Sequence, residues 1–131
     1  MEYSKNAVYN YVATAINSQF EDAYCTSRYV PKPSQFPSCY IHEIDNSRPI
    51  EYTQLDFDDV QWESAFEIQV TSTKANTAST EAYAIMKIAD DAFNKLYYRR
   101  FSQTSLDLGD RFTIIGRYRR HVGGGDVMPN T

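Results

Sequence analysis

The chain has 131 residues, of which 42% are hydrophobic and 23% are charged. These values fit one globular domain and exclude a collagen, a coiled coil or a disordered chain. No run of 18 apolar residues occurs, so we expect no membrane-spanning helix, and the first residues lack the basic start and apolar block of a secretory signal. Tyrosine is abundant, with 11 copies, and it is a residue type suited to contact surfaces.

The net charge of −4 is unevenly distributed along the chain. The stretch from Glu43 to Glu67 holds eight acidic residues against one basic residue, whereas the stretch from Lys95 to Arg120 holds seven basic residues against two acidic ones. Opposed charges of this kind suit head-to-tail packing of like subunits, but charge alone favours the simpler interpretation of two solvated faces of a monomer. The acidic balance counts against a free-standing nucleic-acid-binding protein.

The first third of the chain predicts a helix followed by a loop. Residues 3–19 carry apolar side chains at i, i+3 and i+4 spacing, which predicts an amphipathic helix with Ser4 as its N-cap. Residues 20–37 show no period and contain three prolines, so we predict a long loop there.

The middle of the chain predicts strands. Residues 38–44 read as a short strand that begins after a proline, and residues 45–49 have the composition of a turn. Residues 50–57 predict a second, weaker strand. Residues 62–72 alternate strictly, with Phe66, Ile68 and Val70 on one face, which predicts a strand of an antiparallel sheet with one wet face.

The last third predicts a helix and a hairpin. Residues 78–98 have a continuous apolar stripe, and the cations Arg99 and Arg100 follow where a helix dipole favours them. Residues 101–107 and 111–120 read as two strands joined by a turn at residues 108–110.

This order of elements predicts a single α+β domain over residues 1–122. We expect an antiparallel sheet of about four strands covered by two helices. The tail of residues 123–131 has few side chains that could pack, so we expect it to be flexible.

The sequence offers little for catalysis or metal binding. It contains two histidines, His42 and His121, and no spacing typical of a zinc site, a phosphate-binding loop or a nucleophile elbow. Cys39 and His42 are three apart on a strand and so point to opposite faces, and adjacent Asp90 and Asp91 are expected on a solvated helix face. We therefore expect no enzymatic activity, no metal and no cofactor. We expect Cys25 and Cys39 to be reduced, with a packing role.

A basic cluster near the C-terminus is the clearest functional feature. It lies beside Tyr97, Tyr98 and Tyr118 and consists of Arg99, Arg100, Arg117, Arg119, Arg120 and His121. Arginine beside tyrosine can contact nucleic-acid phosphates and bases, can anchor an acidic surface of another protein, or can be a solvated surface. The sequence leaves these three interpretations open.

The order of patterns resembles one known family. Residues 36–46 form a strand led by proline and ended by an acidic residue and asparagine, and residues 63–72 alternate. A long alanine-rich helix containing residues 89–93 and a final strand with Arg117, Tyr118 and Arg119 follow. Over most of residues 3–122 this order resembles the small tail-terminator and tail-completion proteins of long-tailed bacteriophages, often labelled minor capsid proteins.

The resemblance implies a structural protein of the virion neck, assembled in the host bacterial cytoplasm. Its α+β subunits would form a hexameric ring that caps the tail tube, ends tube polymerisation and provides the docking surface for the head connector or head-completion protein. The family is not enzymatic and uses no cofactor. DNA would only pass through the lumen, and no membrane is involved.

The resemblance also implies contact residues. Gln54, Asp56, Asp58 and Asp59 match the region that faces the tube or a neighbouring subunit, and Arg117 and Arg119 match the family's basic final strand, at a subunit contact. From the basic cluster we expect Arg99, Arg100 and Arg120 at a subunit or partner interface as well. The segment 20–37 is longer than the family pattern, which implies an extra contact arm and keeps a different connector ring, such as a head-completion protein, as an alternative. A small nucleic-acid-binding module is the less favoured alternative.

Overall fold

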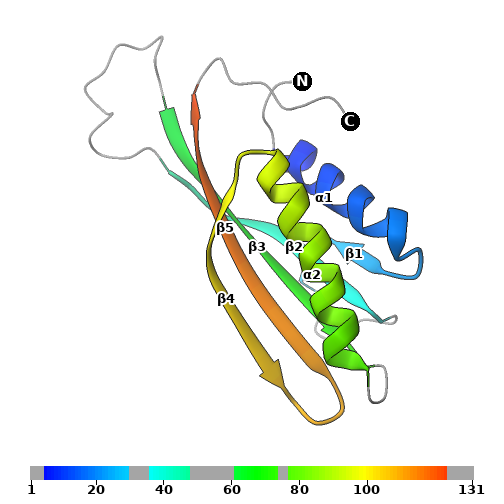
Figure 1. The fold of residues 1–131 in the computed structure, drawn as a ribbon. Helices are drawn as coiled ribbons and strands as arrows, with labels where there is room; N and C mark the ends of the chain where they lie inside the picture. The colour runs from blue at the N-terminus through cyan, green and yellow to red at the C-terminus, as the bar shows by residue number, and fades with distance from the viewer. Residues whose placement is uncertain (1–4, 30–35, 48–60, 74–76, 124–131) are drawn as a thin grey trace.

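The computed structural model describes residues 5–29, 36–47, 61–73 and 77–123 of the chain (Figure 1). Two helices and five strands follow one another in this order: α1 (Lys5–Gln19), β1 (Tyr24–Thr26), β2 (Ser38–Ser47), β3 (Gln61–Ser72), α2 (Ala78–Lys95), β4 (Arg99–Asp107) and β5 (Phe112–Gly123). The predicted strand over residues 50–57 lies outside the described residues.

The strands form one sheet in the order β1-β2-β3-β5-β4. The pairs β2–β3, β3–β5 and β4–β5 are antiparallel, and β1–β2 is parallel. The predicted α+β class is confirmed, but the prediction of about four antiparallel strands was wrong, because the sheet is mixed and has five strands.

The fifth strand comes from the segment predicted as a loop over residues 20–37. β1 is three residues long, too short for any period to show in the sequence. Its first backbone N–H, of Tyr24, donates to the Pro37 carbonyl at 2.9 Å, which aligns β1 beside the start of β2. The first strand of the sheet therefore lies inside the stretch that composition alone predicts to be irregular.

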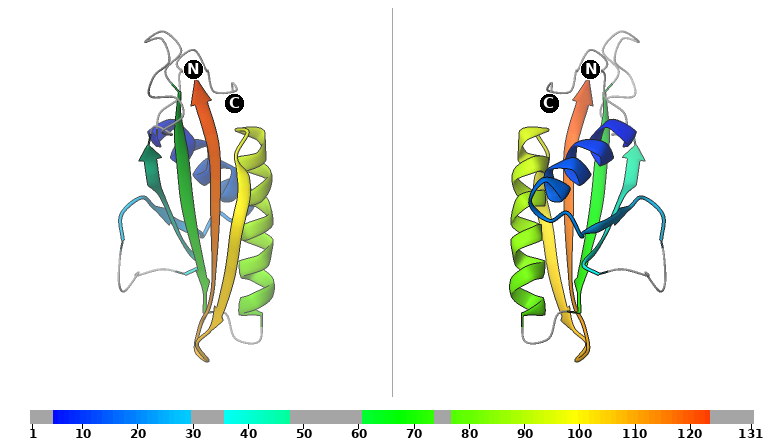
Figure 2. Two further views of the ribbon diagram at one scale, coloured as in Figure 1. Left: turned by 90° about the vertical axis from the view of Figure 1, so that its left-hand side faces the viewer. Right: turned by 90° about the vertical axis from the view of Figure 1, so that its right-hand side faces the viewer.

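Both helices pack on the same face of the sheet, and the core lies between them and the strands (Figure 2). The predicted apolar faces are confirmed, since the stripe of α2 is buried from Ala82 to Leu96 and the inner side chains of β3 are buried as well. The rings of Phe93 on α2 and Tyr118 on β5 stack with centroids 4.3 Å apart and join the two layers. Truncating Phe93 to alanine should cost about 3–5 kcal/mol of stability.

Helix α2 ends three residues before the predicted boundary. Tyr97 adopts a left-handed backbone conformation with φ of 68°, and the N–H of Tyr98 donates to the Phe93 carbonyl at 2.9 Å. These contacts close the helix as a C-terminal cap. The buried Tyr98 ring packs edge-on against Phe66 at 5.6 Å. Arg99 and Arg100 are therefore the first residues of β4, and the prediction that they close the helix was wrong.

The predicted turn after β2 is also displaced. Residues 45–47 continue β2 beyond an irregularity in its pairing between Glu43 and Asp45. An extra residue of this kind, here Ile44, is a β-bulge, and it keeps the strand paired while shifting its side chains by one position.

Neither of the two described helices covers the other face of the sheet, onto which the left panel of Figure 2 looks. Neither α1 nor α2 is long and apolar enough to span a lipid bilayer. The strands therefore expose side chains on the uncovered face and along the two edges of the sheet, in addition to the side chains on the outer surfaces of the helices.

Candidate functional site

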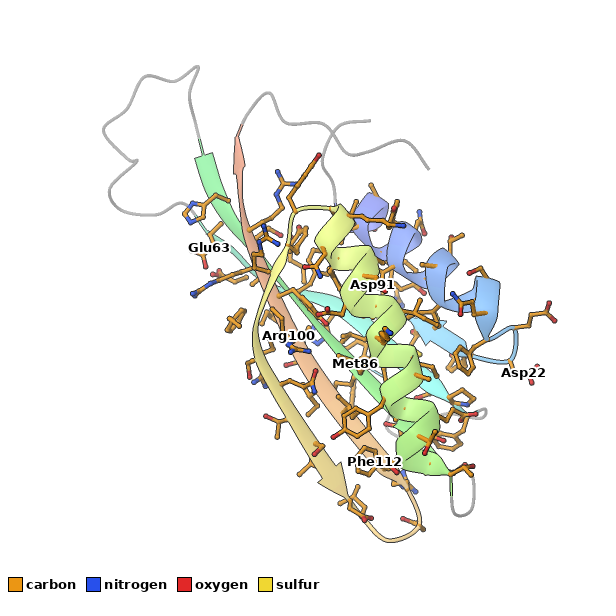
Figure 3. The ribbon with its side chains drawn as sticks, in the orientation of Figure 1. Asp22, Glu63, Met86, Asp91, Arg100 and Phe112 are labelled. Atoms are coloured by element: carbon orange, nitrogen blue, oxygen red, sulfur yellow. The ribbon has the colours of Figure 1, made fainter. Side chains whose placement is uncertain are left out.

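The uncovered face of the sheet is the candidate site. Residues that pair directly across neighbouring strands share a face. Pairing and alternation along β2, β3, β5 and β4 therefore assign the following side chains to it: Ser38, Tyr40, His42, Asp45, Glu63, Ala65, Glu67, Gln69, Thr71, Thr113, Ile115, Arg117, Arg119, His121 and Arg99. Figure 3 shows Glu63 on the side of the sheet away from α2, and Arg100 on the side where α2 lies. We call this set the uncovered face below.

Glu67 lies at the centre of the uncovered face and is its most sheltered acid. Its carboxylate accepts hydrogen bonds from His42 Nε2 at 3.0 Å, Gln69 Nε2 at 2.9 Å and Arg117 Nε at 2.8 Å. Burial by itself raises the pKa of this carboxyl, but the hydrogen bonds from Gln69, His42 and Arg117 outweigh burial and hold the pKa below its usual value. Glu67 is therefore held ionised and links three strands.

Aromatic rings flank this charged centre. The ring of Tyr40 stacks on His42 with centroids 4.1 Å apart, and Tyr29 leans against Tyr40 at 5.9 Å. Toward β4, the Arg119 guanidinium lies over the Phe101 ring at 4.9 Å. Exposed rings beside charged groups are typical of protein contact surfaces.

The predicted basic cluster is divided between the two faces of the sheet. Arg117 and Arg119 lie on the uncovered face, where Arg117 pairs with Glu67 and Arg119 stands opposite Arg99 of β4. Arg99 and Arg119 are both exposed. These three arginines form the basic end of the uncovered face.

The other two predicted arginines lie toward the helices. Arg120 Nη1 donates to the Leu96 carbonyl at 2.8 Å, and its guanidinium lies over the rings of Tyr97 and Tyr98. Arg100 lies 3.8 Å from the Asp90 carboxylate on α2 and donates to Gln103. The five predicted arginines therefore do not form one patch.

The predicted contact residues of the acidic segment, Gln54, Asp56, Asp58 and Asp59, lie outside the described residues. Their assignment to a subunit or partner contact stays a prediction.

The expectation that Asp90 lies on a solvated helix face was wrong. Asp90 is half-buried and accepts hydrogen bonds from Tyr118 Oη at 3.1 Å and from Asn94 Nδ2 at 3.3 Å, whereas Asp91 is exposed as predicted. Burial and the neighbouring Asp90 carboxylate raise the pKa of Tyr118 well above its ordinary value. Asp90 thus ties α2 to β5 through Tyr118.

The two cysteines are neighbours, which their separation in the sequence does not indicate. Cys25 and Cys39 stand opposite each other in the parallel pair β1–β2, and both are free thiols. The hydrogen bond from the Cys39 thiol lowers the pKa of Cys25, against the effect of burial, while that bond and burial raise the pKa of Cys39. Cys25 is half-buried and Cys39 is buried, so the two thiols differ in reactivity.

Within the described ranges, no three His, Cys, Asp or Glu side chains come together as a group that could hold a metal ion. No model of a known protein family matches the chain, and no curated protein matches its sequence. The uncovered face combines the Glu67–Arg117 ion pair with the exposed rings of Tyr29 and Phe101.

Proposed function

We propose that this chain is a structural protein of the neck of a long-tailed bacteriophage. In this role it forms a ring that caps the tail tube, ends tube polymerisation and provides the surface on which the head connector docks. The observation that carries the proposal is the polarity of the sheet, which has Glu43 and Asp45 near one edge and Arg99 and Arg100 at the opposite edge.

Polarity of this kind supports ring formation because a ring contact is heterologous. Each subunit in a ring offers one surface to the preceding copy and a different surface to the next. Acidic residues near one edge and basic residues at the other meet that requirement. A two-fold dimer formed through either edge would instead place two copies of the same edge, and therefore like charges, against each other. The resemblance of the element order to that of tail terminators supports the placement of such a ring at the tail.

The engagement of the arginines favours a protein partner over nucleic acid. Arg117 is bonded to Glu67, and Arg100 and Arg120 lie toward the helices, so the cluster offers no continuous basic groove for a phosphate backbone among the described residues. DNA passing through a ring would be tolerated rather than captured, which an acidic chain suits.

The test is the assembly state of the purified full-length chain, alone and with tail-tube protein of the same phage. Native mass spectrometry and negative-stain imaging should show closed rings, in solution or on tube ends, and tubes assembled with the protein should stop growing. Rings that bind the connector but ignore the tube would instead assign the chain to the head-completion proteins. A monomer that ignores both, or binding to DNA that weakens steeply with salt, would contradict the proposal.

A further inference from the structure

Two thiols stand side by side where β1 joins the sheet. Cys25 of β1 pairs with Cys39 of β2, and both are free. Neighbouring strands lie about 4.8 Å apart, and disulfides join Cα atoms that are about 4.4–6.8 Å apart. Both side chains point to the helix side of the sheet, because Cys39 also pairs with buried Val70 of β3. The backbone therefore holds the two sulfurs where a disulfide can join them.

The two thiols differ in their access to solvent. Cys39 is fully buried, whereas Cys25 is half-buried and lines a surface hollow of about 700 Å³. The lining of this hollow comes from α1, from β1 and from the turn between them, with Tyr9 and Asn17 on the α1 side. A small molecule that enters the hollow therefore reaches the sulfur of Cys25 before that of Cys39.

Cys25 is also the thiol that ionises more readily. The hydrogen bond from Cys39 holds the pKa of Cys25 below its ordinary value, against the effect of burial, whereas the pKa of Cys39 is raised. The thiolate is the form of cysteine that attacks the sulfur of a disulfide. Exposure and ionisation therefore give the same residue, Cys25, the role of the attacking thiol.

The charges of the hollow favour one class of small disulfide. Glu21 and Asp22 both line the hollow and are exposed, and its described lining contains no lysine and no arginine. Acidic groups around a reactive atom raise the local concentration of cations and lower that of anions. A disulfide that carries ammonium groups, such as cystamine, is therefore attracted toward Cys25, and glutathione disulfide, whose net charge is negative, is repelled.

We propose that Cys25 and Cys39 form a thiol–disulfide exchange site for small, positively charged disulfides. The Cys25 thiolate attacks one sulfur of the small disulfide, whose S–S bond breaks; a mixed disulfide forms on Cys25 and one small thiolate leaves and takes up a proton. The Cys39 thiol then loses its proton and attacks Cys25 Sγ, which releases the second small thiol and forms the Cys25–Cys39 disulfide. The two cysteines are oxidised by two electrons, and the small disulfide is reduced to two thiols.

The product ties β1 covalently to β2. Without it, the backbone pairing of β1 extends over three residues, Tyr24 to Thr26. The exchange needs only one copy of the chain, so it does not depend on the proposed ring.

Reaction of the reduced full-length protein with cystamine, followed by mass spectrometry, tests the exchange. The unchanged protein should lose the mass of two hydrogen atoms and retain no bound cysteamine, and its digest should contain Cys25 joined to Cys39. Cys39→Ser, which keeps a hydrogen-bond donor beside Cys25, should instead accumulate one bound cysteamine. Cys25→Ser should react at least about tenfold more slowly than Cys39→Ser, because its remaining thiol becomes accessible only when the structure opens locally.

A pair of matched variants tests the charge preference. Asp22 lies just beyond α1 and Asp91 lies on α2, as Figure 3 shows, and both are exposed. At low salt, Asp22→Asn should lower the ratio of the reaction rate with cystamine to the rate with glutathione disulfide, and Asp91→Asn should leave this ratio unchanged. The same change in both variants would contradict the role given to the acids of the hollow.

Other outcomes would overturn the exchange site itself. These are a mixed disulfide that persists on the unchanged protein, a disulfide between two copies in place of the one within the chain, and equal rates for folded Cys25→Ser and Cys39→Ser. Circular dichroism checks that each variant is folded. If Cys39→Ser does not fold, acid quenching of the unchanged protein early in the reaction decides, since bound cysteamine should be found on Cys25 and its presence on Cys39 would overturn the assignment. Ring formation by the unchanged protein is measured separately, so the exchange site and the proposed function can fail independently.

Discussion

Glu67 and Arg117 face each other across β3 and β5, with Arg117 Nε 2.8 Å from Glu67 Oε2. The carboxylate side chain is only 10% exposed, whereas the guanidinium side chain is 38% exposed. The acid is thus the more buried partner, and the hydrogen bond from Arg117 helps to stabilise its ionised form. Breaking a pair of this kind costs more than forming it gains, because the sheltered charge is left with fewer partners.

The first prediction separates two arginines that look alike in the sequence. Arg117→Ala should lower the free energy of unfolding by about 1–3 kcal/mol, because Glu67 loses a charged hydrogen-bond partner. Arg119→Ala should change it little, because Arg119 is exposed and contacts the ring of Phe101 rather than an acid. Urea denaturation of the three proteins measures both values. Equal losses for the two variants would contradict the central role of Glu67.

The second prediction concerns pH. The pKa of Glu67 is lower in the folded protein than in the unfolded chain, so its stabilising contribution is present above the unfolded pKa of about 4.3 and is lost as the pH falls through the folded pKa. The unchanged protein should therefore be more stable than Glu67→Gln at neutral pH, and the difference should shrink in acid. Unfolding free energies of both proteins from pH 7 downward test this. A difference that stays constant through the acid range would show that the charge of Glu67 contributes nothing.

The elements that sequence predicts well here are those with a long, strong period. β3 alternates over its whole length, and the stripe of α2 recurs from its first turn to its last, so burial imposes the pattern on many residues at once. β1 has three residues and the bulge at Ile44 depends on the pairing partner. Neither β1 nor the bulge produces a periodic pattern of apolar residues, so neither could be predicted from the sequence.

The centre of the site could not be predicted because it depends on register. His42, Glu67 and Arg117 come from three strands, and the histidine and the arginine are 25 and 50 residues from the glutamate. Alternation places Glu67 on the wet face of its strand, but only the alignment of β2 and β5 against β3 shows that a histidine and an arginine converge on it. The separation of two arginines, in contrast, follows from alternation alone. Arg119 and Arg120 are adjacent in the sequence of β5, so their side chains point to opposite faces of the sheet.

The third prediction concerns the thiols. Cys25 should react with iodoacetamide well before Cys39, because it is more exposed and its pKa is lowered, whereas Cys39 is buried and its pKa is raised. Cys39→Ala should slow the alkylation of Cys25 at neutral pH by removing the hydrogen bond, and Cys39→Ser, which keeps a donor, should slow it less. Peptide mapping by mass spectrometry after timed labelling gives the rates. Equal labelling of both cysteines in the folded protein would contradict the described environment.

The fourth prediction concerns Gly116, where β5 passes close to α2. A Cβ added at this position would stand 2.5 Å from Met86 Cε and 3.3 Å from Tyr118 Cε1, so the methionine must move aside. Gly116→Ala should therefore cost about 1–3 kcal/mol, as overpacking of a core usually does. In a Met86→Ala background the same change should cost less, because the closest contact is gone and only the Tyr118 ring must still adjust by a small amount.

Gly109 provides the matched control for this pair of substitutions. It lies in the β4–β5 turn with φ of 86°, and an added Cβ there meets no atom within 4 Å. Gly109→Ala should cost about 1 kcal/mol through backbone strain alone, with or without Met86. For each glycine, the free energies of unfolding of the unchanged protein, the two single variants and the double variant are measured by thermal or urea unfolding. The effect of Gly116→Ala should depend on whether Met86 is present, and the effect of Gly109→Ala should not. Equal coupling at both positions would mean that Met86→Ala alters the domain as a whole rather than relieving one close contact.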